Sequence, residues 1–144
     1  MLNLKIKSYL LGLFDLFLAW GAIYYGVLMI QQKAVMFEEY PQEWLTKVPF
    51  TSWVAPGIIA ITVYGFGNLM AAVFSFFNIN NKPWLASAVM GGFLLFSLIV
   101  QGFLFGEIYL PTIYFYLFSF IQLIMSASLY RSVRKNSDKI LLTK

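Results

Sequence analysis

The chain has 144 residues, of which 60% are hydrophobic and only 11% charged, and its net charge is +4. Soluble domains carry about 25% charged residues and small ones bury only about two-thirds of their chain surface, so this composition excludes a water-soluble fold. The sequence has no cysteine and no histidine, which excludes disulfides, thiolate nucleophiles, imidazole bases and the usual zinc sites.

Four long apolar runs are predicted to cross a membrane as helices. They cover approximately residues 9–30, 54–77, 84–105 and 110–130. Each is close to the ~20 residues that span ~30 Å of hydrocarbon, and an open sheet edge is not stable in lipid. The first run is too long for the apolar part of a secretory signal, so we interpret it as a span. We expect an all-α membrane protein with a single domain, residues 1–144.

The basic residues flank the apolar runs and predict the orientation of the chain. With the N-terminus inside, the cytoplasmic segments hold Lys5, Lys7, Lys82, Arg131, Arg134, Lys135, Lys139 and Lys144. The outer segments hold only Lys33 and Lys47. The positive-inside rule therefore places both termini in the cytoplasm of a cell with this protein in its plasma membrane. The pattern indicates a lipid bilayer and not nucleic acid as the partner, and residues 131–144 are expected to form a solvated, frayed tail.

The connections between the spans differ in length. "NINNKP" and "GEIYLP" contain Asn, Gly and Pro, which are typical of tight turns. Spans 2 and 3, and spans 3 and 4, are therefore predicted to be antiparallel neighbours in an up-down four-helix bundle.

The first outer loop is longer, and Pro41 is expected to open a short helix within it. Trp44, Leu45 and Val48 would form the apolar side of this helix. We predict that it lies on the outer membrane surface. Its aromatic anchors would be Tyr40, Trp44 and Trp53. An ordinary loop with interfacial aromatic residues is the alternative.

Small and polar residues mark the inward faces of the helices, because in lipid hydrophobicity does not select a face. In the first span these residues are Ser8, Gly12, Asp15, Ala19, Ala22 and Gly26. Their spacing, close to 3.5 residues, is typical of a left-handed helix seam. The second span offers Gly57, Ala60, Tyr64, Asn68, Ala71 and Ser75; the third Ser87, Gly91, Ser97, Gln101, Gly102 and Gly106; the fourth Thr112, Ser119, Gln122 and Ser126. Such stripes are first of all packing devices.

Asp15 is an ionisable residue within the apolar stretch "LGLFDLFLAWGAIYYG". At about 1.5 Å rise per residue, Asp15, Asn68 and Gln122 fall within one layer about 5 Å deep in the inner half of the bilayer. We predict that these three residues form a buried polar cluster, with Tyr64 one turn farther outward. Ionisable groups within the membrane are candidate binding or proton sites. Either the amides donate to an ionised Asp15, or a neutral Asp15 is itself a donor.

A second polar group is predicted toward the outside and consists of Gln101 and Glu107, joined by Tyr24 or Tyr25. Glu107 lies in a turn, so a solvated loop acid is the alternative. A continuous polar path from Glu107 to Asp15 would indicate transport.

Catalytic and cofactor-binding motifs have little support in this sequence. Gly65 and Gly67 begin a dinucleotide-like pattern, but the third glycine is replaced by Met70, within a span. The adjacent Glu38 and Glu39 are better interpreted as a solvated face than as acid-base catalysts. We expect no metal site and no cofactor, and an enzyme activity has no positive support.

The start of span 2, "VPFTSWVAPGIIAITVYGFGN", the Gly-rich start of span 3 with Gln101, and "PTIYFYLFSFIQL" of span 4 carry a resemblance. Over roughly residues 48–130 the chain resembles an uncharacterised family of small bacterial four-helix integral membrane proteins, loosely DoxX-like. The resemblance implies fold and location. It implies no activity and no functional residue.

Two functions follow as hypotheses. The first is a non-enzymatic envelope or accessory protein that binds a partner, either another membrane protein or a second copy of itself. The second is a binder or proton-linked transporter of a small apolar or protonatable molecule, with a polar bundle interior around Asp15. A lipid-active enzyme ranks behind both.

Overall fold

The computed structural model of the chain describes residues 2–31, 42–78, 82–106 and 110–142. In chain order the elements are α1 (Leu2–Ile30), η1 (Gln42–Lys47), α2 (Val54–Ile59), η2 (Ala60–Gly65), α3 (Phe66–Phe77), α4 (Leu85–Phe105) and α5 (Leu110–Leu142). η1 is a 3-10 helix, and η2 is a π-helical turn that joins α2 to α3. Within these residues, four helical stretches are long and apolar enough to cross a membrane. This confirms the predicted multi-pass membrane protein.

Two helices extend beyond the predicted spans. α1 begins at Leu2 rather than near residue 9, and α5 continues from Leu110 to Leu142 through the basic segment. The expected frayed tail is therefore helical up to residue 142. Lys and Arg are good helix formers, and cations near a helix C-terminus interact favourably with its dipole. These residues end a membrane span without ending the helix.

The helices that precede the two short turns end in left-handed residues. Asn78 follows α3 with φ 48°, and Gly106 follows α4 with φ 68°. The Gly106 N–H donates to the Gly102 carbonyl at 3.0 Å. A left-handed residue at this position closes the last helical turn, and Gly and Asn adopt it at lower cost than other residues. The Asn and Gly signals in the sequence thus act at the predicted ends.

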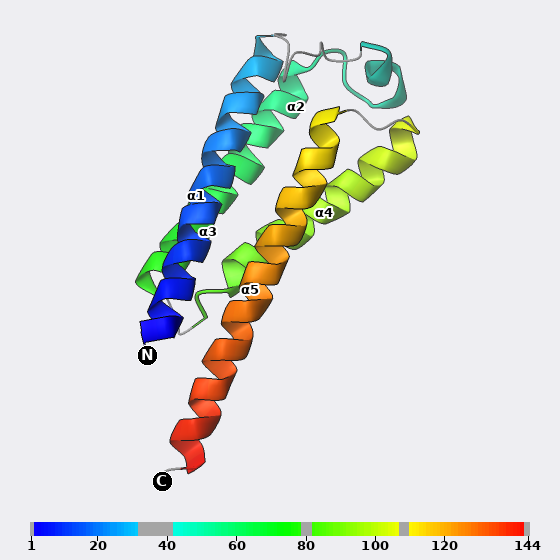
Figure 1. Cartoon of the computed structure of the whole chain (residues 1–144). Coiled ribbons are helices and arrows are strands. Elements are labelled where there is room, and N and C mark those ends of the chain that lie inside the picture. The colour runs from blue at the N-terminus through cyan, green and yellow to red at the C-terminus, as the bar shows by residue number, and fades with distance from the viewer. Residues whose placement is uncertain (1, 32–41, 79–81, 107–109, 143–144) are drawn as a thin grey trace.

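Figure 1 shows how the helices pack. α1 lies along α2, η2 and α3, and α4 lies along α5. Contacts between α3 and α4 and between α1 and α5 join these two groups. The residues at the centre of the four helices therefore come from α1, α3, α4 and α5.

A small aromatic core closes the end of the molecule where η1 lies. Trp44 in η1 is 4% exposed, Trp53 6% and Phe105 8%, and the Trp44 and Phe105 rings stack at 4.2 Å. The Lys47 ammonium donates to the Phe105 carbonyl at 2.6 Å and so satisfies an acceptor in the last turn of α4. Both indoles are covered by protein, whereas the sequence predicts membrane anchors. Tyr40 and Pro41 lie outside the described residues.

Glycine allows α1 and α2 to approach closely. A Cβ atom added at Gly26 would lie 2.8 Å from the Gly57 carbonyl oxygen, and one added at Gly57 would lie 2.7 Å from the Gly26 carbonyl oxygen. Small residues permit such backbone contact between membrane helices. The predicted inward positions Gly26 and Gly57 are thus both buried at a helix interface.

We expect Gly26→Ala to destabilise the protein by about 1–3 kcal/mol, because the added methyl group meets backbone that cannot rotate away. Unfolding in mild detergent, followed by circular dichroism during SDS titration, measures the change. Gly21→Ala is the matched control in the same helix, since a Cβ atom there meets nothing within 4 Å. Equal stability of the two variants would contradict the close contact between α1 and α2.

Candidate functional site

The Asp15 side chain lies at the centre of the four long helices and is 0% exposed. The Gln122 Nε2 group in α5 donates to Asp15 Oδ1 at 2.8 Å. The Ser87 hydroxyl in α4 donates to Asp15 Oδ2 at 2.5 Å. Ser87 and Gln122 are also 0% exposed. The carboxyl group therefore joins three helices through uncharged partners in an interior that water does not reach.

Gln122 extends this network to the second span. Its Nε2 group also donates to Asn68 Oδ1 at 2.7 Å, and Asn68 Nδ2 donates to the Tyr64 carbonyl at 2.8 Å. Asn68 is 2% exposed. A single amide group thus bridges Asp15 in α1 and Asn68 in α3, so that all four spans contribute to one set of hydrogen bonds.

Two serines continue the network toward the turn between α3 and α4. The Ser75 hydroxyl lies 3.0 Å from the Pro83 carbonyl oxygen and 3.4 Å from both Asp15 Oδ2 and Ser87 Oγ. A serine hydroxyl has one hydrogen, and the shortest of these contacts is to an oxygen that can only accept. Ser75 therefore donates to Pro83, and Ser87 is the principal donor to Oδ2. Ser8 in α1 donates to the Ser75 carbonyl at 2.5 Å.

We name Asp15, Asn68, Ser75, Ser87 and Gln122 the polar cluster. One of its atoms, Gln122 Oε1, is buried without a hydrogen-bond partner among the described residues. A buried unsatisfied acceptor costs about 1–3 kcal/mol. This oxygen lies against Gly91, where an added Cβ atom would be 3.2 Å from it. The missing side chain of Gly91 gives the Gln122 amide the room that it occupies.

The structure brings together Asp15, Asn68 and Gln122, which the sequence predicts as one group. Tyr64 contributes its main-chain carbonyl to Asn68, whereas its hydroxyl is hydrogen-bonded to Ser97 in α4. Tyr64 therefore lies beside the polar cluster and points its phenol away from the carboxyl group.

The predicted outer group is only partly described. Gln101 Nε2 donates to Thr112 Oγ1 at 3.3 Å, and Glu107 lies outside the described residues. Tyr24 is exposed and Tyr25 half-buried, and their rings contact each other edge-on. In the part of the chain that the structure describes, no chain of hydrogen bonds links Gln101 to the polar cluster.

The sequence interpretation places Ser75 and Ser87 on inward stripes but not beside Asp15. Their position was readable in part, because Ser75 lies seven residues, or about two helical turns, after Asn68 on the same face. The stripe of the third span mixes buried and exposed positions: Ser87 and Gly91 are buried, whereas Gly102 and Gly106 are exposed. That mixture hides which of its polar residues points inward.

The polar cluster can hold a hydrogen-bonded carboxyl group in either protonation state. An ionised Asp15 accepts from Gln122 and Ser87, while a neutral Asp15 can donate to the Ser87 hydroxyl, which then donates onward. Among the described residues, no three acidic side chains converge to hold a metal ion. Comparisons of the chain with protein-family models, with curated proteins and with solved structures gave no match.

Proposed function

We propose that this chain is a non-enzymatic accessory protein of the plasma membrane, which acts by binding another membrane protein or a second copy of itself. Its four spans would form an antiparallel up-down bundle with both termini in the cytoplasm, and η1 would lie at the outer surface. The excess of Lys and Arg beside the N-terminus and after span 4 supports this orientation. The resemblance to small four-helix, loosely DoxX-like membrane proteins is part of the same proposal.

The observation that carries the proposal is the complete burial of the polar cluster. Asp15, Ser87 and Gln122 are each 0% exposed. A binding or transport site must be reached from one side of the membrane, whereas a cross-link between helices must exclude water. We therefore assign Asp15 a structural role, in which it holds four helices in one arrangement and leaves the outer surface of the bundle for partners.

We expect Asp15→Asn to accumulate in the membrane and to fold, because asparagine has nearly the same shape and can still accept from Ser87 or Gln122. Asp15→Leu should fold less stably, because it leaves both of these donors without a partner. Wild-type protein in liposomes that contain a pH-sensitive dye should conduct protons no faster than protein-free liposomes. Co-purification under mild detergent should recover a partner or a dimer, and protein that is always isolated as a monomer counts against the proposal.

The second candidate is a proton-linked binder or transporter centred on Asp15. The unpartnered Gln122 Oε1 favours it, since a protonated ligand group would satisfy this oxygen. In that case the liposomes would show proton flux, and Asp15→Asn would abolish the flux while leaving the protein folded. Such a result would replace the accessory role by a transport function.

A further inference from the structure

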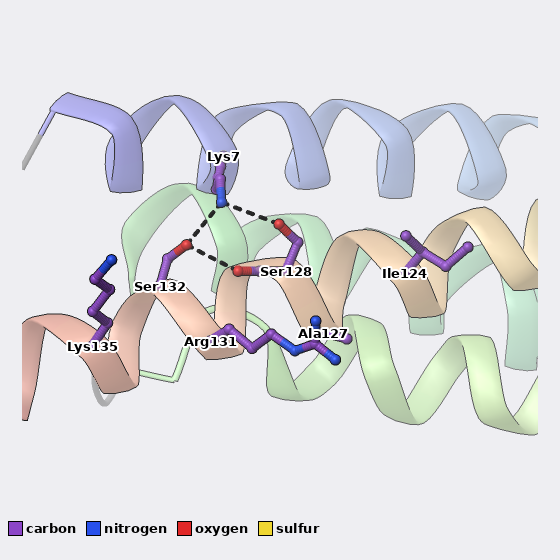
Figure 2. A pocket seen from close by; sticks show the side chains of 7 residues that line it. All are labelled: Lys7, Ile124, Ala127, Ser128, Arg131, Ser132 and Lys135. Atoms are coloured by element: carbon purple, nitrogen blue, oxygen red, sulfur yellow. Dashed lines mark hydrogen bonds between the residues drawn. The ribbon is translucent and has the colours of Figure 1, made fainter.

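A groove between α1 and α5 lies away from the polar cluster and has a volume of about 460 Å³. It is lined by Lys7, Ile124, Ala127, Ser128, Arg131, Ser132 and Lys135. Figure 2 shows Lys7 reaching from α1 across to α5, while Arg131 and Lys135 extend from α5 itself. No acidic side chain is among these lining residues.

Lys7 is held in place by two serines. Its ammonium group donates to Ser128 Oγ at 3.1 Å and to Ser132 Oγ at 2.8 Å, and the side chain is half-buried. An ammonium group has three hydrogens, so one N–H remains for a further acceptor. The cation is thus fixed at the helix interface and has the capacity to bind an anion.

The groove is polar at one end and apolar at the other. Arg131 and Lys135 are exposed toward the C-terminal part of α5, while Ile124, one to two turns earlier, is 67% exposed. Lys7 precedes Asp15 by eight residues, which is about 12 Å along a helix. In the orientation proposed above, the cations therefore lie at the level of the inner headgroups and Ile124 lies at the level of the acyl chains.

We infer that this groove binds the phosphate of an anionic phospholipid in the inner leaflet. Arg131 can bind phosphate oxygens in a bidentate manner, and Lys7 and Lys135 supply two more positive charges. Exposed Ile124 and Ala127 would contact the start of an acyl chain. Basic pockets between membrane helices on the cytoplasmic side are suited to such headgroups. The inference depends on the proposed orientation but not on whether Asp15 is structural or functional.

The test compares lipids in solution with the full-length protein in detergent. Phosphatidylglycerol should raise the thermal midpoint of the wild type, whereas phosphatidylcholine and inorganic phosphate at the same concentration should not. Native mass spectrometry should show bound phosphatidylglycerol. We expect the double variant Arg131→Gln/Lys135→Gln to bind this lipid at least tenfold more weakly, because both exposed cations of the groove are removed.

The matched control is Lys5→Gln/Arg134→Gln, which removes two charges from the same two helices outside the groove. It should bind phosphatidylglycerol like the wild type, and Lys7→Gln should weaken binding in the same way as the groove variant. Equal losses in the groove and control variants would show general charge attraction and overturn the inference. An equal effect of inorganic phosphate would also overturn it, since the ligand would then be a free anion. The proton-flux assay has a separate readout, so either proposal can fail alone.

Discussion

Gln122→Leu is expected to destabilise the protein by about 1–3 kcal/mol. The substitution removes the hydrogen bonds to Asp15 Oδ1 and Asn68 Oδ1, and a hydrogen bond between membrane helices is worth about 0.6–1.7 kcal/mol. It also leaves two buried oxygens with fewer donors. SDS titration in mild detergent, followed by circular dichroism, measures the free energy of unfolding.

Gln101→Leu is the matched control, because it makes the same chemical change at a half-buried site with a single 3.3 Å bond to Thr112. It should cost less than half as much. The double variant Asp15→Leu/Gln122→Leu should lose less stability than the sum of its single variants, since residues in one network are coupled. Additive losses would show that Asp15 and Gln122 act independently, contrary to the structure.

Trp44→Ala is expected to have the largest effect outside the bundle centre, about 3 kcal/mol. The indole is 4% exposed and stacks on Phe105 at 4.2 Å, so its removal leaves a cavity between η1 and the end of α4. The thermal midpoint in detergent should fall accordingly.

The control for this substitution is Trp20→Ala, which removes an indole that is 64% exposed on α1. Lipid or detergent already covers that side chain in the folded state, so little contact with protein is lost. If Trp20→Ala lowered the midpoint as much as Trp44→Ala, the aromatic core at η1 would not be a significant source of stability.

Much of the helix packing was predictable because the membrane constrains it. Hydropathy gives the spans, since lipid allows only helices of nearly fixed length. Small and polar stripes indicate the inward faces, and the rise per residue places Asp15, Asn68 and Gln122 at one depth. In the structure these three residues are hydrogen-bonded to one another. Periodicity and depth together therefore predicted contacts between residues as far as 107 positions apart.

Other features depend on tertiary contacts that a single sequence does not encode locally. The burial of Trp44 requires Phe105 to lie beside it, and an interfacial tryptophan has the same local sequence. The helical segment after Tyr130 depends on propensity, which hydropathy ignores. The hydrogen bond from Ser87 depends on the rotation of α4, whose stripe is ambiguous. In each case the sequence names the residue but leaves open which neighbour covers it.

The π-helical turn Ala60–Gly65 has a mechanical consequence for the second span. Outward of it, α2 contacts α1; inward of it, α3 contacts both α1 and α4. A helix bends most easily where its regular hydrogen-bond ladder is interrupted. Forces that act on the outer loop would therefore be relieved at this turn, before they reach Asn68. The inner half of the bundle can keep its geometry while the outer half adjusts to membrane thickness or to a neighbouring protein.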